Sequence, residues 1–471
     1  MNIETSYSDT RRKLHSALRV DNSFDLLERD IVVGGKRTTL FFVDAFTKDA
    51  VMEKVFEFLM RISEEEMQSL KDANSFASYS LPYIKISFET DTDTVVTSVL
   101  SGITAMVVEG YADVLLIDVR SYPVRGIDEP QDDRVLRGSH DGFVEALAFN
   151  TAMIRRRIRD PRITFEIVKV GSKSRTDIAI CYLEGCCDQK HLAMIRSKLQ
   201  SITIPSLSMG QESLLECLCR RQRYNPFPKV RYTERPDSAA ASVAEGKILL
   251  LVDNSPSAMI LPTGFFDFMQ DTNDYYFPPL IGSYLRFLRT AVLILSLFLT
   301  PFWFLLMQNE WEVPTSLAFL KVSEPNSVPI LIQLLAIELI IDVVKLASLN
   351  TPNTLSNAFS VVGALIFGEF AVRANLFVPE VLLYMAFVSV SAFTQASYEM
   401  GYAFKLMRIV FLLLTAAFNV WGFVAGVALL ILLISTTQTP LGYTYLYPLI
   451  PFNGRALMRL FSRRSISRFN S

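Results

Sequence analysis

The sequence predicts a cytoplasmic α/β or α+β region of two subdomains, followed by an all-α transmembrane bundle. The main observation is the charge distribution along the 471 residues. Residues 1–290 contain 36 Lys and Arg and 40 Asp and Glu, whereas residues 291–450 contain only 5 and 8. A charged region followed by a nearly uncharged one is typical of a soluble part attached to membrane-spanning helices. We expect subdomains at 1–160 and 161–285, a helical domain at 286–450 and a basic tail at 451–471.

Composition argues against several classes of protein. The formal net charge of −2 is unlike that of a strongly basic nucleic-acid-binding protein, so no nucleic acid is expected as a partner. Five cysteines, an odd number, argue against a secreted disulfide scaffold. Residues 1–30 are polar and lack the apolar core of a signal peptide. We therefore expect the soluble region to stay on the side of the membrane where it is synthesised.

The first subdomain alternates strand and helix patterns. Thr38–Phe46 reads as a buried strand, and Asp49–Ile62 follows with the spacing of a helix. Tyr83–Phe88 alternates apolar and polar residues, as a half-buried strand does. Asp113–Val119 (DVLLIDV) is an almost continuous apolar run, which indicates a central strand covered on both faces.

The second subdomain continues this pattern after a helix at Gly142–Ile158. Ile163–Val170 and Asp177–Leu183 read as two strands joined by a glycine-containing turn. His191–Leu199 has helical spacing, and Lys247–Val252 is a short buried strand. Mixed elements of this kind predict an α/β or α+β fold.

Two segments of the apolar part are long enough to span a membrane. Thr290–Met307 has 18 uncharged residues, about 27 Å as a helix, and Ile409–Ile434 has 26, about 39 Å. Arg286 and Arg289 precede the first, so the positive-inside rule places the soluble region in the cytoplasm. The basic tail is expected on the same side, which requires an even number of crossings.

Three further apolar segments lie between these two, at 328–347, 358–372 and 381–397. With five candidates in all, one is expected to lie in the interface or to re-enter. Glu338, Asp342 and Lys345 fall within an arc of about 60° on the first of the three. This charged stripe is either a set of structural ion pairs inside the bundle or a wet path for ions, and spacing alone does not decide between them.

The segment 358–372 is short and rich in small residues, with Gly363, Ala364 and Gly368 suited to close helix packing. Between residues 328 and 400 the sequence contains five acidic and two basic residues. Such an excess of negative charge favours the passage of cations over that of anions. One chain with four or five spans can hardly enclose a pore. A ring of identical chains can, with one short helix from each chain along the axis.

The soluble region contains two charged stretches that admit two interpretations each. A Pro- and Gly-rich loop contains Arg125, Glu129 and Arg137, and it is either a subunit-contact and signalling loop or a solvated loop. Arg155, Arg156 and Arg157 are assigned to the same subunit-contact and signalling role. They either bind anionic lipid or phosphate, or simply end a helix on a solvated face.

The sequence contains no recognisable catalytic or metal-binding motif, so no enzyme, cofactor or metal is expected. The three histidines, His15, His140 and His191, lie far apart without the spacing of metal ligands. Nucleophile-elbow, Walker and dinucleotide-binding motifs are not found.

Several short motifs follow one another along the chain. They are Tyr122-Pro-x-Arg125, Arg137-Gly-Ser-x-Asp-Gly-Phe143, Ile154-Arg-Arg-Arg-Ile158, Arg235-Pro236-Asp237, Tyr284-x-Arg286-x-x-Arg289 and Val361-Val-Gly-Ala-Leu-Ile-Phe-Gly368. In this order they resemble the GerA family of spore germinant receptor A subunits. The stretch Val33–Asp44 resembles a sporulation-protein subgroup of that family. Around Glu338 the sequence departs from the receptor subunits, which puts receptor-like nutrient coupling in doubt.

The resemblance implies a protein of the spore inner membrane that forms a homo-oligomeric ring, expected to be pentameric. It implies membrane lipids and other germination membrane proteins as partners, monovalent cations as permeant ions, and amplification of the germination response. With residue size, it assigns the pore and gate to five residues of one helix: Val361, Val362, Leu365, Ile366 and Glu369. The alternative is a non-conducting scaffold or signal-coupling subunit. A secondary transporter ranks last because the sequence shows no internal repeat.

Overall fold

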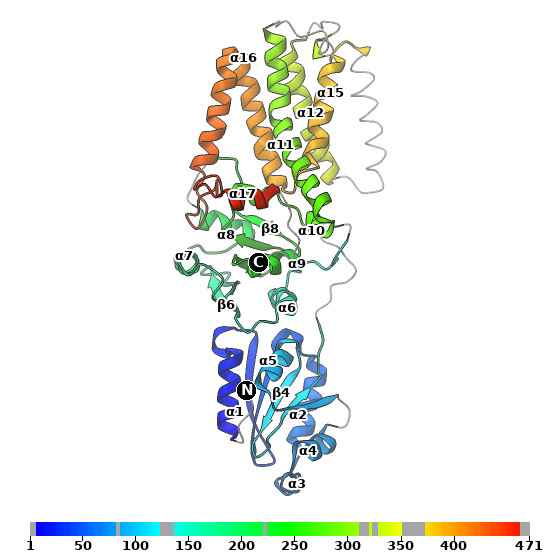
Figure 1. The fold of residues 1–471 in the computed structure, drawn as a ribbon, viewed down its shortest axis with the longest axis vertical. Helices are drawn as coiled ribbons and strands as arrows, with labels where there is room; N and C mark the ends of the chain where they lie inside the picture. Colours follow the sequence, from blue (N-terminus) through cyan, green and yellow to red (C-terminus); the bar gives the residue numbers. More distant parts are fainter. Residues whose placement is uncertain are drawn as a thin grey trace. The chain divides into compact units, whose positions relative to one another are not determined.

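The computed structural model describes residues 6–81, 85–122, 135, 137–219, 224–309, 320–322, 328–350 and 373–461 (Figure 1). The chain divides into two compact units. The first contains Met1–Arg221, Val230–Thr263 and Pro440–Tyr443. The second contains Gln222–Lys229, Gly264–Thr439 and Thr444–Ser471. Most of the charged part thus lies in the first unit and most of the apolar part in the second.

The first unit contains two five-stranded sheets, and the first of them has the strand order β1-β2-β4-β5-β3. Each pairing that joins its strands is antiparallel. The strands are β1 (Leu26–Val33), β2 (Lys36–Val43), β3 (Ile86–Glu89), β4 (Thr104–Val108) and β5 (Val114–Ile117). The helices are α1 (Tyr7–Leu18), α2 (Asp49–Met60), α3 (Glu64–Ser69), α4 (Ala73–Ser80) and α5 (Thr92–Leu100).

Helices cover both faces of this sheet, and neighbouring strand residues enter opposite cores. Leu40 and Leu115 pack on the face that also receives side chains of α2 and α4. Phe41 and Leu116 pack on the face covered by α1 and α5. Because consecutive side chains of a strand point in opposite directions, a sheet covered on both faces needs almost continuous apolar runs. This confirms the predicted central strand at Asp113–Val119.

The second sheet has the strand order β6-β7-β9-β10-β8, again with antiparallel pairings. Its strands are β6 (Ile163–Val170), β7 (Thr176–Leu183), β8 (Arg231–Thr233), β9 (Ile248–Val252) and β10 (Ala258–Leu261). Its helices are α6 (Leu147–Arg157), α7 (Gln189–Gln200), α8 (Gln211–Leu218) and α9 (Pro236–Ala244). Helices α6 and α9 contribute to one core of the sheet, and α7 and α8 contribute to the other. The soluble part is therefore of the α+β type.

The two halves of the first unit repeat one chain order. Each half runs through a helix, two strands, a group of helices, a strand, a helix and two strands, and the two strand orders are equivalent. Helix α6 takes in the second half the place of α1 in the first. Its Leu147 and Ile154 pack into the core of the second sheet. Helix α6 therefore belongs to the second half, although it lies before residue 160, where the sequence suggested the boundary between the subdomains.

A late segment of the chain completes the second sheet's core. Leu441, which follows the last long apolar helix in sequence, is buried in the cluster formed by the second sheet with α7 and α8. The Lys198 ammonium donates a hydrogen bond to the Pro440 carbonyl at 2.6 Å and to the Leu218 carbonyl at 3.0 Å. Residues 440–443 are therefore a structural part of the first unit.

The second unit is helical. Its described helices are α10 (Asn273–Tyr276), α11 (Pro279–Gln308), α12 (Ile330–Asn350), α15 (Pro379–Ala392), α16 (Tyr398–Thr436) and α17 (Gly454–Phe461). Among the described residues, α11 and α16 are long and apolar enough to cross a membrane. The predicted spans at 290–307, 328–347 and 381–397 correspond to α11, α12 and α15, whereas 358–372 lies outside the described residues.

Helix α16 reverses direction at Asn419, where φ is 56° and ψ is −131° (Figure 1). A Cβ atom at Gly422 would lie 1.8 Å from the Leu414 carbonyl oxygen, and one at Gly426 would lie 2.8 Å from the Phe411 ring. Such distances are possible only if the residues before and after Asn419 pack side by side. The prediction of one continuous helix over 409–434 is therefore wrong, because a tight helical hairpin replaces it.

Candidate functional site

The candidate site is a group of charged side chains between α12 and α16 in the second unit. Glu338 and Asp342 are four residues apart on α12, and Lys405 and Arg408 are three apart on α16. Each spacing places both side chains on one face of its helix. The Glu338 and Arg408 side chains are only 3% and 6% exposed. The helices thus bring two acids and two bases together within an apolar unit.

These four side chains, together called the charge cluster, connect three helices. Arg408 Nε donates to Glu338 Oε1 at 2.6 Å, and Lys405 Nζ lies 3.3 Å from Glu338 Oε2. Lys405 also forms an ion pair with Asp342 and donates to the Glu338 backbone carbonyl at 3.1 Å. Arg408 Nη1 donates to the Ser296 carbonyl of α11 at 3.0 Å. The formal charges of the cluster cancel, which lowers the cost of holding them away from water.

Lys345, the third charged residue of the predicted stripe, also contacts two aromatic rings. Its ammonium lies 5.5 Å from the centre of the Phe393 ring and 5.6 Å from that of Tyr402, a cation–π arrangement. Lys405 and Arg408 of α16 form ion pairs with Glu338 and Asp342, so the cluster contains two basic residues that the sequence analysis did not include. A cavity of about 40 Å³ lies beside the cluster and is lined by Glu338, Lys345 and Arg408 among others.

Sequence reasoning missed both basic partners in the cluster. Lys405 and Arg408 immediately precede an uncharged run, so they read as the flanking charges of a membrane span. One signal pointed to them. Two acidic residues on one face of an apolar helix require basic partners. Lys405 and Arg408 are three residues apart, which places both on one face of their own helix.

Of the predicted signalling residues in the soluble unit, Arg125 and Glu129 lie outside the described residues, and Arg137 is exposed. Arg155 is fully buried. Its Nε and Nη2 donate to the Asp25 carboxylate at 2.5 and 2.9 Å, and Nη2 also donates to Ser23 Oγ at 2.9 Å. This ion pair joins the second half of the unit to the first, so Arg155 presents no guanidinium to another subunit.

The two following arginines are also engaged within the chain. Arg157 Nη2 donates to both oxygens of Asp141 at 2.6 Å, and the Arg156 guanidinium lies 4.4 Å from the centre of the Tyr122 ring. Arg156 is nevertheless exposed and Arg157 is half-buried, so this helix end is partly solvated while both side chains contact groups of the same chain. The predicted pore, gate and packing residues lie outside the described residues, and they are Val361, Val362, Gly363, Ala364, Leu365, Ile366, Gly368 and Glu369.

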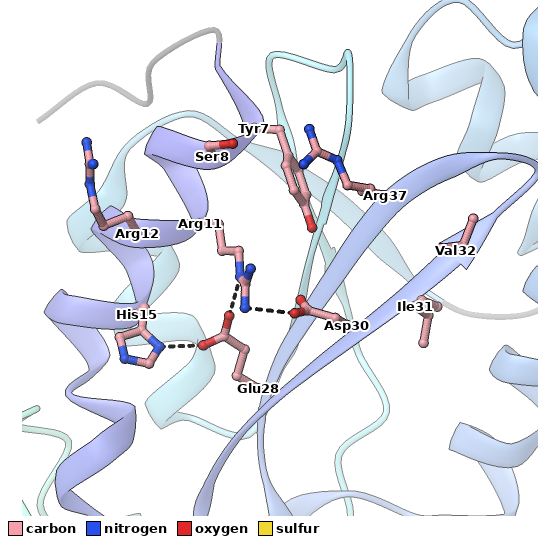
Figure 2. A pocket seen from close by; sticks show the side chains of 10 residues that line it. All are labelled: Tyr7, Ser8, Arg11, Arg12, His15, Glu28, Asp30, Ile31, Val32 and Arg37. Carbon is pink, nitrogen blue, oxygen red and sulfur yellow. Dashed lines mark hydrogen bonds and ion pairs between the residues drawn. The ribbon is translucent and has the colours of Figure 1, made fainter.

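A separate pocket of about 480 Å³ lies in the first unit between α1, β1 and β2 (Figure 2). Arg11 donates to Glu28 at 2.5 Å and lies 2.7 Å from Asp30. His15 contacts Glu28 through Nδ1 and Asp21 through Nε2, the latter at 2.9 Å. The charged side chains of this pocket thus tie α1 to β1.

His15 makes this contact sensitive to pH. Hydrogen bonds to Glu28 and then to Asp21 raise the pKa of His15. A raised folded-state pKa adds stability at pH values below about 6.5, and this contribution is lost as the pH rises through the folded pKa. We expect His15→Gln to lower the melting temperature of the full chain at pH 6 and to have less effect at pH 9. The loss should stay below about 1 kcal/mol because the side chain is partly exposed. An equal shift at both pH values would contradict this assignment.

Comparison with known proteins places the chain in a family. The sequence profile described as Bacillus/Clostridium GerA spore germination protein matches residues 13–471. The chain belongs to the GerA family. Among its GerA relatives, Stage V sporulation protein AF of Bacillus subtilis (strain 168) is 37% identical over 94% of this chain and 89% of the relative. Spore germination protein KA of the same organism is 26% identical over 93% of this chain and 81% of the relative.

A solved structure is also similar to part of the chain. It is the N-terminal domain of the A subunit of the Bacillus megaterium spore germinant receptor GerK3, at 24% identity and a TM-score of 0.43. The match covers 56% of this chain and 98% of the other. The GerA family comprises membrane proteins of spore germination and sporulation, and this chain is one of them.

Proposed function

We propose that the chain is a subunit of a homo-oligomeric, pentameric channel in the spore inner membrane. The channel releases monovalent cations and amplifies the germination response. Family membership over residues 13–471 supports the place in germination, and the name of the relative that is 37% identical supports a link to sporulation. The observation that carries the proposal is the charge cluster on α12, the helix that precedes the proposed pore segment 358–372 in the sequence.

The proposed topology is multi-pass, with the first unit on the cytoplasmic, spore-core side. Arg286 and Arg289 lie in the first turns of α11. Arg286 Nη1 donates to the Leu460 carbonyl of α17 at 3.4 Å, so the last described helix lies at the same end of the second unit as the start of α11. Basic residues at both positions favour the cytoplasmic face for that end.

The charge cluster suits a coupling element better than an ion path. Its two acids are paired with two bases of α16, so they offer no free carboxylate to a passing cation. The cluster instead fixes α12 against α11 and α16. In this proposal, a displacement of α12 moves the small-residue segment 358–372, which lines the axis of the ring. Val361, Val362, Leu365 and Ile366 form the apolar gate and Glu369 attracts cations near one mouth.

Liposomes containing the purified full chain test the channel. We expect Val362→Ala to increase the leak of K⁺ or Na⁺ several-fold, because a smaller side chain lowers the barrier at an apolar constriction. Val390→Ala is the matched control, since Val390 is 64% exposed on α15. The assignment fails if both variants leak like the unmodified protein at equal incorporation.

A non-conducting scaffold or signal-coupling subunit is the second candidate. The internally neutralised cluster favours it, because fully paired charges also suit a purely structural bundle. Under this alternative, no variant conducts in liposomes in any oligomeric state, while other germination membrane proteins still copurify with the chain.

A further inference from the structure

Helix α17 is amphipathic and lies at the end of the second unit where α11 begins. By helical spacing, Arg455 and Arg459 of its sequence, GRALMRLF, fall on one side, and Leu457, Leu460 and Phe461 fall on the opposite side, with Met458 at the boundary beside Arg455. The Met458 side chain is 71% exposed, so a large apolar side chain at the edge of the basic side is left uncovered within the chain. The Leu460 carbonyl accepts the hydrogen bond from Arg286 at the start of α11.

Exposed apolar side chains surround this end of the unit. Just before α17, Ile450 and Phe452 are 56% and 75% exposed. In the first turns of α11, Tyr284 and Phe287 are 61% and 65% exposed. Aromatic and apolar residues exposed at the entry of a membrane helix are typical of the layer between lipid headgroups and acyl chains.

The charge of the C-terminal sequence is one-sided. The last 21 residues contain five arginines and no acidic residue. A short helix with one apolar and one basic side fits the surface of a bilayer that contains anionic lipids, since its apolar side chains enter the boundary layer while its arginines meet the headgroups.

We propose that α17, together with residues 449–453, lies in the membrane interface and binds the headgroups of anionic phospholipids. The proposal rests on α11 crossing the membrane, as in the proposed function, and it holds whether or not the chain conducts ions. The anchor fixes the position of the start of α11 relative to the membrane surface.

A fluorescent label on Met458→Cys tests this placement in the reconstituted full chain. Cys186, Cys217 and Cys219 are first replaced by serine, because Cys186 and Cys217 are exposed and Cys219 is only partly buried. Met209→Cys is the matched control, since Met209 is 73% exposed and lies in the first unit. Vesicles contain phosphatidylglycerol with phosphatidylcholine, or phosphatidylcholine alone, with a spin-labelled lipid as the quencher.

We expect lipid quenching at position 458, stronger in the anionic vesicles, and none at position 209. Each basic residue near an anionic surface strengthens binding about fivefold, so Arg455→Gln with Arg459→Gln should lower the ratio of bound to free helix about 25-fold. Salt at about 1 M shortens the Debye length to about 3 Å, so it should also weaken the binding of the unmodified helix to anionic vesicles.

Two results would overturn the proposal. One is a label at 458 that an aqueous quencher reaches equally in both kinds of vesicle. The other is a label shielded from both lipid and water, which would place Met458 against protein, in another copy of the chain or elsewhere. Loss of ion flux with unchanged lipid quenching would instead contradict only the channel.

Discussion

Glu338→Gln is expected to destabilise the second unit by about 3–5 kcal/mol, the usual cost of removing one partner of a buried ion pair. The neutral amide keeps the shape of the side chain but leaves the buried Arg408 guanidinium without its carboxylate. Thermal unfolding of the detergent-solubilised full chain, followed by size-exclusion chromatography, should show an earlier loss of the folded peak.

Two further variants separate loss of charge from loss of packing. Asp342→Asn should cost less, because the Asp342 side chain is 36% exposed. Glu338→Leu combined with Arg408→Leu should recover much of the lost stability, since it removes both charges and leaves Lys405 paired with Asp342. If Glu338→Gln unfolds at the temperature of the unmodified chain, the charge cluster does not hold α12 against α16.

Gly422→Ala is expected to disrupt the α16 hairpin at a cost of about 3 kcal/mol or more. The added Cβ would lie 1.8 Å from the Leu414 carbonyl oxygen, and a backbone atom cannot move aside without separating the two helices. The folded fraction after detergent extraction, compared at equal expression, measures the effect.

Gly401→Ala is the matched control in the same helix. A Cβ at Gly401 meets no atom within 4 Å, so this change should be neutral or should stabilise the helix by up to about 1 kcal/mol. Equal yields of folded protein from both variants would mean that the two parts of α16 are not closely packed.

Local patterns predicted the elements of the soluble part well where apolar residues dominate. Both strands of the β6–β7 hairpin and the helices α2 and α7 lie within a few residues of the predicted ranges. Periodicity could not show which sheet a helix covers. Helix α6 was therefore placed with the first subdomain, although its apolar side chains complete the second. The duplicated strand order was also invisible, because it depends on the pairing of distant segments rather than on residue type.

The apolar part was harder to predict because burial in lipid and burial in protein select the same residues. Asn419 is a polar residue in a long uncharged run, and the reversal of α16 is seen only in the structure, from the positive φ of Asn419 and the close approach of Gly422 to Leu414. Lys405 and Arg408 looked like flanking charges for the same reason. The sequence offered ion pairs inside the bundle as one of two interpretations of Glu338 and Asp342, and it did not show which residues of other helices would form them.

The burial of Leu441 constrains the order in which the protein is made. Once residue 261 has been synthesised, all strands of the second sheet are present. The core of that sheet is still incomplete at this point, because Leu441 has not been made. This residue leaves the ribosome only after all of α11, α12, α15 and α16 has been synthesised. The second sheet therefore cannot complete its core before these helices have been made, and a chain that stalls or is truncated before residue 440 exposes an incomplete core to the quality-control proteases of the cell.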